Sequence, residues 1–108
     1  MSLSWPTVFD PDETKDYFRD WTNELTSIGD TISTVSFVLP TSATDAGLSV
    51  ESTDIDSTAM IAIVWFTSTD PDGVRAALVD TTVLVDHTIT TSGGRTYNET
   101  IKLKVKEK

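Results

Sequence analysis

Apolar and polar residues alternate along much of the C-terminal half of the chain. In residues 95–106 the odd positions from Tyr97 to Val105 are mostly apolar, and the even positions are Thr, Asn and Lys. A strand with one buried face and one wetted face has this period of two. Residues 76–89 show the same alternation, and the Ser-Gly-Gly sequence at 92–94 is typical of a hairpin turn. These segments predict two long antiparallel strands.

Further strands are predicted upstream of this hairpin. Residues 58–68 are apolar on both faces, which is typical of a central strand covered on both sides. Residues 31–39 are expected to form a strand that ends at Pro40, and residues 48–51 a short strand. Segments 40–47, 52–57 and 70–73 are expected to be loops or turns. We expect one core to contain Ile61, Ile63, Trp65, Val83, Val85, Ile101, Leu103 and Val105.

Residues 10–25 fit two structures. The sequence Asp-Pro-Asp-Glu at 10–13 is a good helix start, and a helical apolar stripe follows it. Alternatively, the same four residues form a turn before a strand at 15–21, with Tyr17, Arg19 and Trp21 on one face and a short helical turn at 22–25. In either case Trp21 is expected in the core, and the sequence leaves both structures open.

The order of these elements predicts the fold class. Several strands follow one another at short intervals, without the spacing of alternating strands and helices. We therefore expect an all-β protein, an immunoglobulin-like antiparallel β-sandwich of about seven strands. The 108 residues suffice for one domain. Residues 1–13 are expected to form an extended N-terminal arm, and residues 14–108 the sandwich domain.

Composition and charge narrow the function classes. The chain has no cysteine and one histidine, which excludes a disulfide framework and a Cys/His zinc site. Its net charge of −9 opposes binding to nucleic acid. No apolar run reaches the length of a membrane span, and the first residues lack the features of a signal peptide. We expect a protein made and folded in a cytoplasm, with no membrane partner.

Few residues suggest catalytic or metal chemistry. Paired aspartates spaced two apart at 10–12, 54–56 and 70–72 resemble part of a calcium loop, but none completes an EF-hand, and turn hydrogen bonds explain them. His87 lies on, or at the end of, the apolar face of its strand without a nucleophile beside it, so we expect a strand-end histidine that makes a hydrogen bond. No catalytic residue, metal ligand or cofactor site is predicted.

Two features suggest contacts with other proteins. The N-terminal arm carries aromatic and aliphatic side chains, which either pack on a neighbour or fold back over their own sandwich. Lysines at strand spacing near the C-terminus form either a solvated, edge-protecting face or a docking face. Because residues 1–30 are rich in acids, head-to-tail contact between copies is also expected. The candidate docking residues are Trp5, Val8, Phe9, Lys102, Lys104 and Lys106.

Several short motifs carry a family resemblance. They are DPDE at 10–13, DY at 16–17, DWT at 20–22 with Leu25, GDTIS at 29–33, GLSV at 47–50, and above all ITTSGGRT at 89–96 followed by ETIKLKV at 99–105. Together they resemble a family of small tailed-phage virion proteins of the fiber-tail adaptor type. The likeness covers most of residues 9–107. The sequence departs from the family pattern after Trp65, where a Gly-Gly turn is usual.

The resemblance implies a non-enzymatic structural protein of a tailed bacteriophage particle. It would act as an adaptor that joins tail or fiber components, with other virion proteins and copies of itself as partners. The alternatives are a capsid decoration protein and, from other classes, a sugar- or calcium-binding sandwich module or a small hydrolase. The sequence shows no clustered aromatic platform for a sugar and no activated nucleophile for a hydrolase.

Overall fold

The computed structural model describes residues 2–107, which form seven strands and three short helices. In chain order the elements are β1 (Ser2–Ser4), β2 (Lys15–Asp20), α1 (Thr22–Thr26), β3 (Ile32–Val38), α2 (Thr41–Ala46), β4 (Leu48–Ile55), β5 (Ile61–Ser68), α3 (Pro71–Leu78), β6 (Thr81–Thr91) and β7 (Thr96–Val105).

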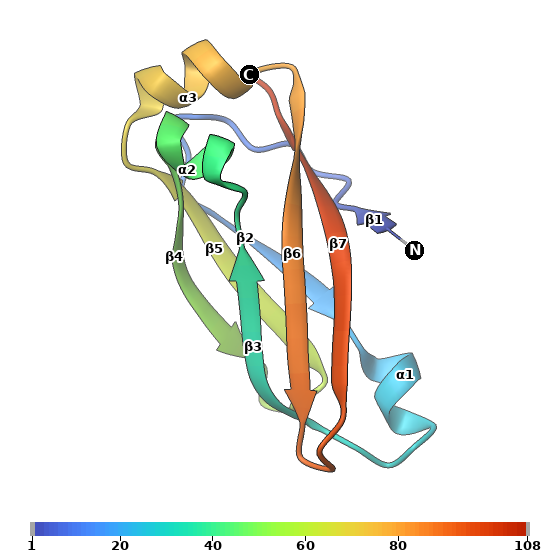
Figure 1. The fold of residues 1–108 in the computed structure, drawn as a ribbon. Coiled ribbons are helices and arrows are strands. Elements are labelled where there is room, and N and C mark those ends of the chain that lie inside the picture. Colours follow the sequence, from blue (N-terminus) through green and yellow to red (C-terminus); the bar gives the residue numbers. More distant parts are fainter. Residues whose placement is uncertain (1, 108) are drawn as a thin grey trace.

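The strands form two sheets that pack face to face. One sheet has the order β1-β7-β6-β3, and the other has the order β2-β5-β4. Helices α2 and α3 lie together at one end of the molecule, and α1 lies at the other end (Figure 1). The main core fills the space between the sheets. The predicted all-β sandwich class is confirmed, and the immunoglobulin-like detail stays a prediction.

The hairpin of β6 and β7 is confirmed, with a turn at the predicted Ser-Gly-Gly sequence. The predicted start of the second long strand, at residue 76, was wrong. The helix α3 extends to Leu78, and β6 starts only at Thr81. The Asp70 carboxylate accepts a hydrogen bond from the Gly73 amide, and Pro71 stands in the first turn. These are helix-start signals, which the prediction assigned to a simple turn.

Strand β5 is central in its sheet, as predicted, but it is covered on one face only. Ala62, Val64 and Phe66 are fully buried between the sheets. The expectation that Ile61, Ile63 and Trp65 belong to the core was wrong: Trp65 is 39% exposed, and the two isoleucines are half-buried. The reason is that no further layer within residues 2–107 covers the outer side of this sheet. The other predicted core residues, Val83, Val85, Ile101, Leu103 and Val105, are buried.

The ambiguous segment 10–25 forms a turn, the strand β2 and the short helix α1. The alternative of a turn followed by a strand is therefore confirmed, and the long helix is not formed. Pairing with β5 places Tyr17 opposite Val64 in the core. Trp21 follows the strand and is buried, as expected.

Two predicted loops contain regular structure. Residues 41–46 form α2, and β4 extends to Ile55 beyond a register shift near Glu51. Gly47 ends α2 with a φ of 112°, and a Cβ there would lie 2.7 Å from the Cβ of Asp70. This close approach of α2 to the start of α3 requires a glycine. The expectation of loops at 40–47 and 52–57 was wrong in these parts.

Candidate docking surfaces

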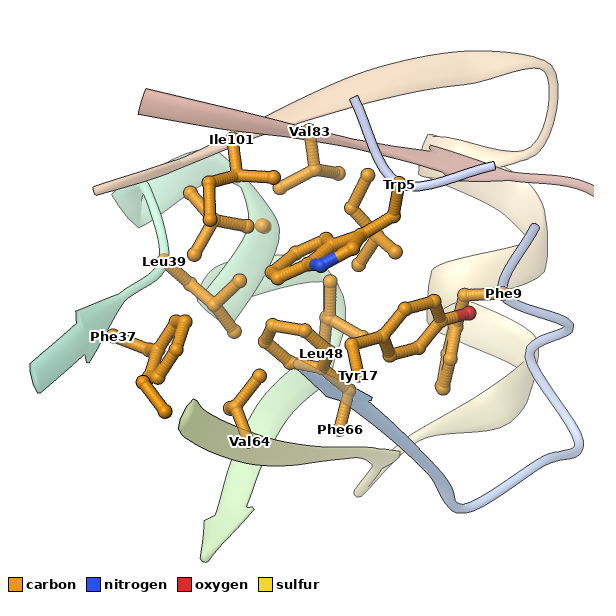
Figure 2. Close-up of a cluster of buried hydrophobic side chains, with 14 of the residues drawn as sticks. Trp5, Phe9, Tyr17, Phe37, Leu39, Leu48, Val64, Phe66, Val83 and Ile101 are labelled. Atoms are coloured by element: carbon orange, nitrogen blue, oxygen red, sulfur yellow. The ribbon is translucent and has the colours of Figure 1, made fainter. Parts of the chain in front are cut away.

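The N-terminal segment packs on its own sandwich. Strand β1 runs parallel to β7, and Phe9 forms an isolated parallel bridge with Val105. Trp5 is 7% exposed and Phe9 is fully buried. Figure 2 shows Trp5 among the core side chains, with its ring centroid 5.1 Å from that of Tyr17.

Polar groups of two aromatic residues hold this segment in place. Trp5 Nε1 donates a hydrogen bond to the Phe18 carbonyl oxygen over 2.9 Å, and the Tyr17 hydroxyl donates to the Val8 carbonyl oxygen over 2.9 Å. Burial raises the pKa of Tyr17, so its hydroxyl keeps the proton that it donates. The alternative in which the arm folds back over its own sandwich therefore describes the structure. Trp5 and Phe9 offer no exposed side chain to a partner, and Val8 is half-buried.

The predicted lysines lie on the outer side of the four-stranded sheet. Lys102, Lys104 and Lys106 are exposed, and no ion pair formed within residues 2–107 involves them. Leu84 of β6 is the register partner of Lys102 and is 54% exposed. Val38 of β3 lies on the same side of the sheet and is 53% exposed. We call these five residues the lysine face.

A second exposed apolar surface was missed by the sequence analysis. Phe18 of β2, which is 59% exposed, lies beside Ile63 of β5 on the outer side of the three-stranded sheet. Trp65 is on the same side of the same strand. The apolar run at 58–68 contained the signal, but apolar residues on both faces were interpreted as evidence of cover on both sides. The same pattern also fits one face in the core and one face offered to a partner.

The other charged clusters have structural roles. The Arg19 guanidinium pairs with Glu24 over 2.6 Å and with Glu99 over 2.5 Å, and it lies 4.0 Å from the centroid of the Trp21 ring. It thus connects β2, α1 and β7. Arg75 in turn pairs with Asp12, Asp72 and Glu107, which connects the N-terminal turn, α3 and the C-terminal end.

Two of the motifs that carry the family resemblance meet in space. The Asp30 carboxylate accepts hydrogen bonds from the backbone amides of Thr31 and Gly93 and lies 2.9 Å from Arg95 Nη1. Hydrogen bonds, first of all that of the Thr91 side chain, lower the pKa of Asp30 to about 2. The ionised Asp30 therefore organises the turn between β6 and β7. A Cβ on Gly93 would lie 2.9 Å from Asp30 Oδ2.

Histidine and paired aspartates are engaged in hydrogen bonds within the fold. His87 is fully buried and bonds to Trp21 and Ser36, as expected for a structural histidine. Asp56 accepts from the amides of Met60 and Ile61, which is turn chemistry. Within residues 2–107, no group of three or more His, Cys, Asp or Glu side chains is arranged to hold a metal ion. No helix in the same range is long and apolar enough to cross a membrane.

Comparison with known proteins gives one family. The family model described as podophage GP4 fiber-tail adaptor protein gp77 matches residues 10–104. The match spans every strand from β2 onward, apart from the last residue of β7. No curated protein matches the chain.

Proposed function

The chain belongs to the podophage GP4 fiber-tail adaptor protein family, and from this premise we propose that it joins tail or fiber components of a phage particle through protein–protein contacts. Membership in the family indicates a structural role in a bacteriophage tail. The finer proposal is a non-enzymatic adaptor, made in the host cytoplasm and present in the virion in several copies. Its partners are other virion proteins and further copies of the chain.

The lysine face is the observation that carries this proposal. On a chain with a net charge of −9, three exposed lysines lie on the same side of the sheet as exposed Leu84 and Val38, and no ion pair within residues 2–107 involves them. Strand β7 is not a free edge, because β1 pairs along its other side. Protection of a sheet edge therefore does not explain why a lysine stands at position 102. A role of this lysine in docking a partner would explain it.

The rigid attachment of this face to the core also supports an adaptor. On β7, exposed lysines alternate with Ile101, Leu103 and Val105, which are buried. The positions of the lysines are thus set by the packing of their neighbours. A pre-ordered surface loses little conformational entropy when a partner binds, which suits a permanent joint in a particle.

Quantitative mass spectrometry of purified phage particles tests the proposed function. An adaptor of the tail is expected at a low, fixed copy number per particle, together with the tail and fiber proteins. Hundreds of copies per particle would instead indicate capsid decoration. Absence of the protein from washed particles would overturn the proposal that it is a virion component.

A further inference from the structure

An apolar strip with an acidic border crosses the outer side of the three-stranded sheet. Its centre consists of Ile61, Ile63 and Trp65, which are successive outward residues of β5. Phe18 of β2 extends the strip, since it is the register partner of Ile63. Trp65 and Phe18 are among the most exposed large apolar side chains within residues 2–107. A monomer gains no stability from exposing such side chains together.

A carboxylate lies on the neighbouring strand or turn beside each of the three outward residues of β5 in this strip. Asp16 is the register partner of Trp65 on one side, and Asp54 is the register partner of Ile63 on the other side. Asp20 is the register partner of Ile61 on β2, and the amide of Asp56 donates to the Ile61 carbonyl oxygen. Hydrogen bonds from the Thr22 and Thr58 side chains lower the pKa values of Asp20 and Asp56, so both carboxylates are ionised at neutral pH. We call the set Asp16, Phe18, Asp20, Asp54, Asp56, Ile61, Ile63 and Trp65 the acidic face.

The lysine face has the complementary chemistry. Its apolar part is Leu84 and Val38, and its positive part is Lys102 and Lys104 on β7 and Lys106 just after it. One acid, Asp86, lies on the same side as the register partner of Val38, and its carboxylate accepts a hydrogen bond from Asn98 Nδ2. The two faces are the outer sides of two sheets that pack against each other through their inner sides. They therefore cannot meet within one chain, because the core lies between them. Only a second copy can bring them together.

We propose that the acidic face of one copy docks against the lysine face of a second copy, so that the chain assembles head to tail. The proposal rests on the adaptor function above, and it adds the two surfaces and the partner. Because the two faces differ, the contact is heterologous, and repetition of it generates a ring when the rotation between copies closes. The apolar centres supply burial, while the charges fix orientation and register.

The net charge of each chain should keep this contact weak between free copies. Each chain carries −9, so two copies repel each other over the rest of their surfaces. Opposite charges meet only where the acidic face lies against the lysine face. Assembly is therefore favoured when a platform holds the copies close together, and self-association in solution depends on high concentration.

Zero-length cross-linking of purified particles tests the contact directly. A carbodiimide joins a lysine amine to a carboxylate only when the two groups touch, and the reagent takes up the water lost as the amide forms. We expect cross-links from Lys102 or Lys104 to Asp16, Asp20, Asp54 or Asp56. Such links must connect different copies, since the sandwich separates the faces in one chain. Cross-links from these lysines to other virion proteins alone would overturn the proposal.

A mixing experiment in solution tests the same contact without particles. The variant Phe18→Ser/Trp65→Ser removes the apolar part of the acidic face, and Lys102→Gln/Lys104→Gln removes the charge of the lysine face. All four side chains are exposed, so both variants should fold. At low ionic strength and about 1 mM protein, the original chain should self-associate in sedimentation velocity. Each variant alone should be monomeric, and an equimolar mixture should form dimers but nothing larger.

The matched control is Ile28→Ser, which removes an exposed apolar side chain outside both faces. This variant should associate like the original chain. A monomeric original chain under these conditions, or normal association of the Phe18→Ser/Trp65→Ser variant, would overturn the contact between copies. The adaptor function would still stand if particles contain the protein, so the two failures are distinguishable.

Discussion

Trp21 Nε1 donates a hydrogen bond to His87 Nε2 over 3.1 Å, and this bond connects the end of β2 in one sheet to β6 in the other. The indole nitrogen can only donate, so Nε2 of His87 carries no proton. The other ring nitrogen, Nδ1, lies 3.0 Å from the Ser36 carbonyl oxygen and donates to it. Phe37 stacks on the imidazole with ring centroids 4.0 Å apart. The site therefore holds a neutral histidine.

The free energy of unfolding should fall as the pH drops below about 6.5. Burial lowers the pKa of His87 in the folded chain, whereas the unfolded chain takes up the proton near the ordinary value of 6.5. Between the two pKa values the unfolded state binds more protons, with a limiting slope of about 1.4 kcal/mol per pH unit. Urea unfolding at pH 7.5 and pH 5 measures this. A His87→Gln variant should lose the dependence, and an equal stability of the original chain at both pH values would contradict it.

Truncation of a core residue on β7 should destabilise the sandwich strongly. Ile101 is buried, and Ile101→Ala removes apolar contacts and leaves a cavity, at a cost of about 2–5 kcal/mol. Leu84→Ala, on the paired strand but on the exposed side, should cost less than about 1 kcal/mol. Chemical denaturation of both variants gives the comparison. Equal losses would show that the two sides of the hairpin have been assigned wrongly.

The N-terminal segment should contribute to the stability of the whole domain. Trp5 packs in the core, so Trp5→Ala should cost about 3–5 kcal/mol. Trp65→Ala removes a side chain of the same size that is 39% exposed on the outer side of the sheet, so it should cost distinctly less than Trp5→Ala. Urea denaturation of the two variants tests the difference. A Trp5→Ala protein as stable as the original chain would mean that the segment is detached in solution.

Acid should abolish the contribution of the Asp30 carboxylate to the stability of the fold. The hydrogen bonds that hold its pKa at about 2 stabilise the fold at pH values above the ordinary carboxyl pKa, and this stabilisation is lost as the pH falls towards 2. The variant Asp30→Asn should therefore melt at a lower temperature than the original chain at pH 7. The difference in melting temperature should shrink as the pH approaches 2. Asp45→Asn, at an exposed position of α2, serves as the control and should not change the melting temperature.

Reversal of the lysine charges should weaken incorporation into particles. The variant Lys102→Glu/Lys104→Glu/Lys106→Glu places acids where the proposed partner surface is acidic, so we expect fewer copies per particle, with a loss that depends on the salt concentration. Mass spectrometry of particles assembled at two salt concentrations measures it. The variant with arginine at the same three positions keeps the charge and should incorporate normally. Normal copy number of the glutamate variant would remove the lysine face from the docking surfaces.

Local patterns in the sequence determined much of the sandwich. The alternation at 95–106 predicted which side of β7 is buried, because a strand turns successive side chains to opposite faces whatever its neighbours are. The Ser-Gly-Gly turn, the central position of β5, the burial of Trp21 and the hydrogen-bonded state of His87 followed from similar local reasoning. The motifs that resembled the fiber-tail adaptor family also identified the family correctly.

Contacts between segments that are distant in the sequence decided the parts of the fold that local patterns did not predict. The sequence shows that β5 is apolar on both sides, but only the number of layers decides that Trp65 faces outward. Likewise, Trp5 is buried because β1 pairs with β7, about a hundred residues further along the chain. Helices α2 and α3 owe their close packing to Gly47 and Gly73. Periodicity records which faces of an element are apolar. What covers each face depends on the free energy of packing between elements, which no local window of sequence contains.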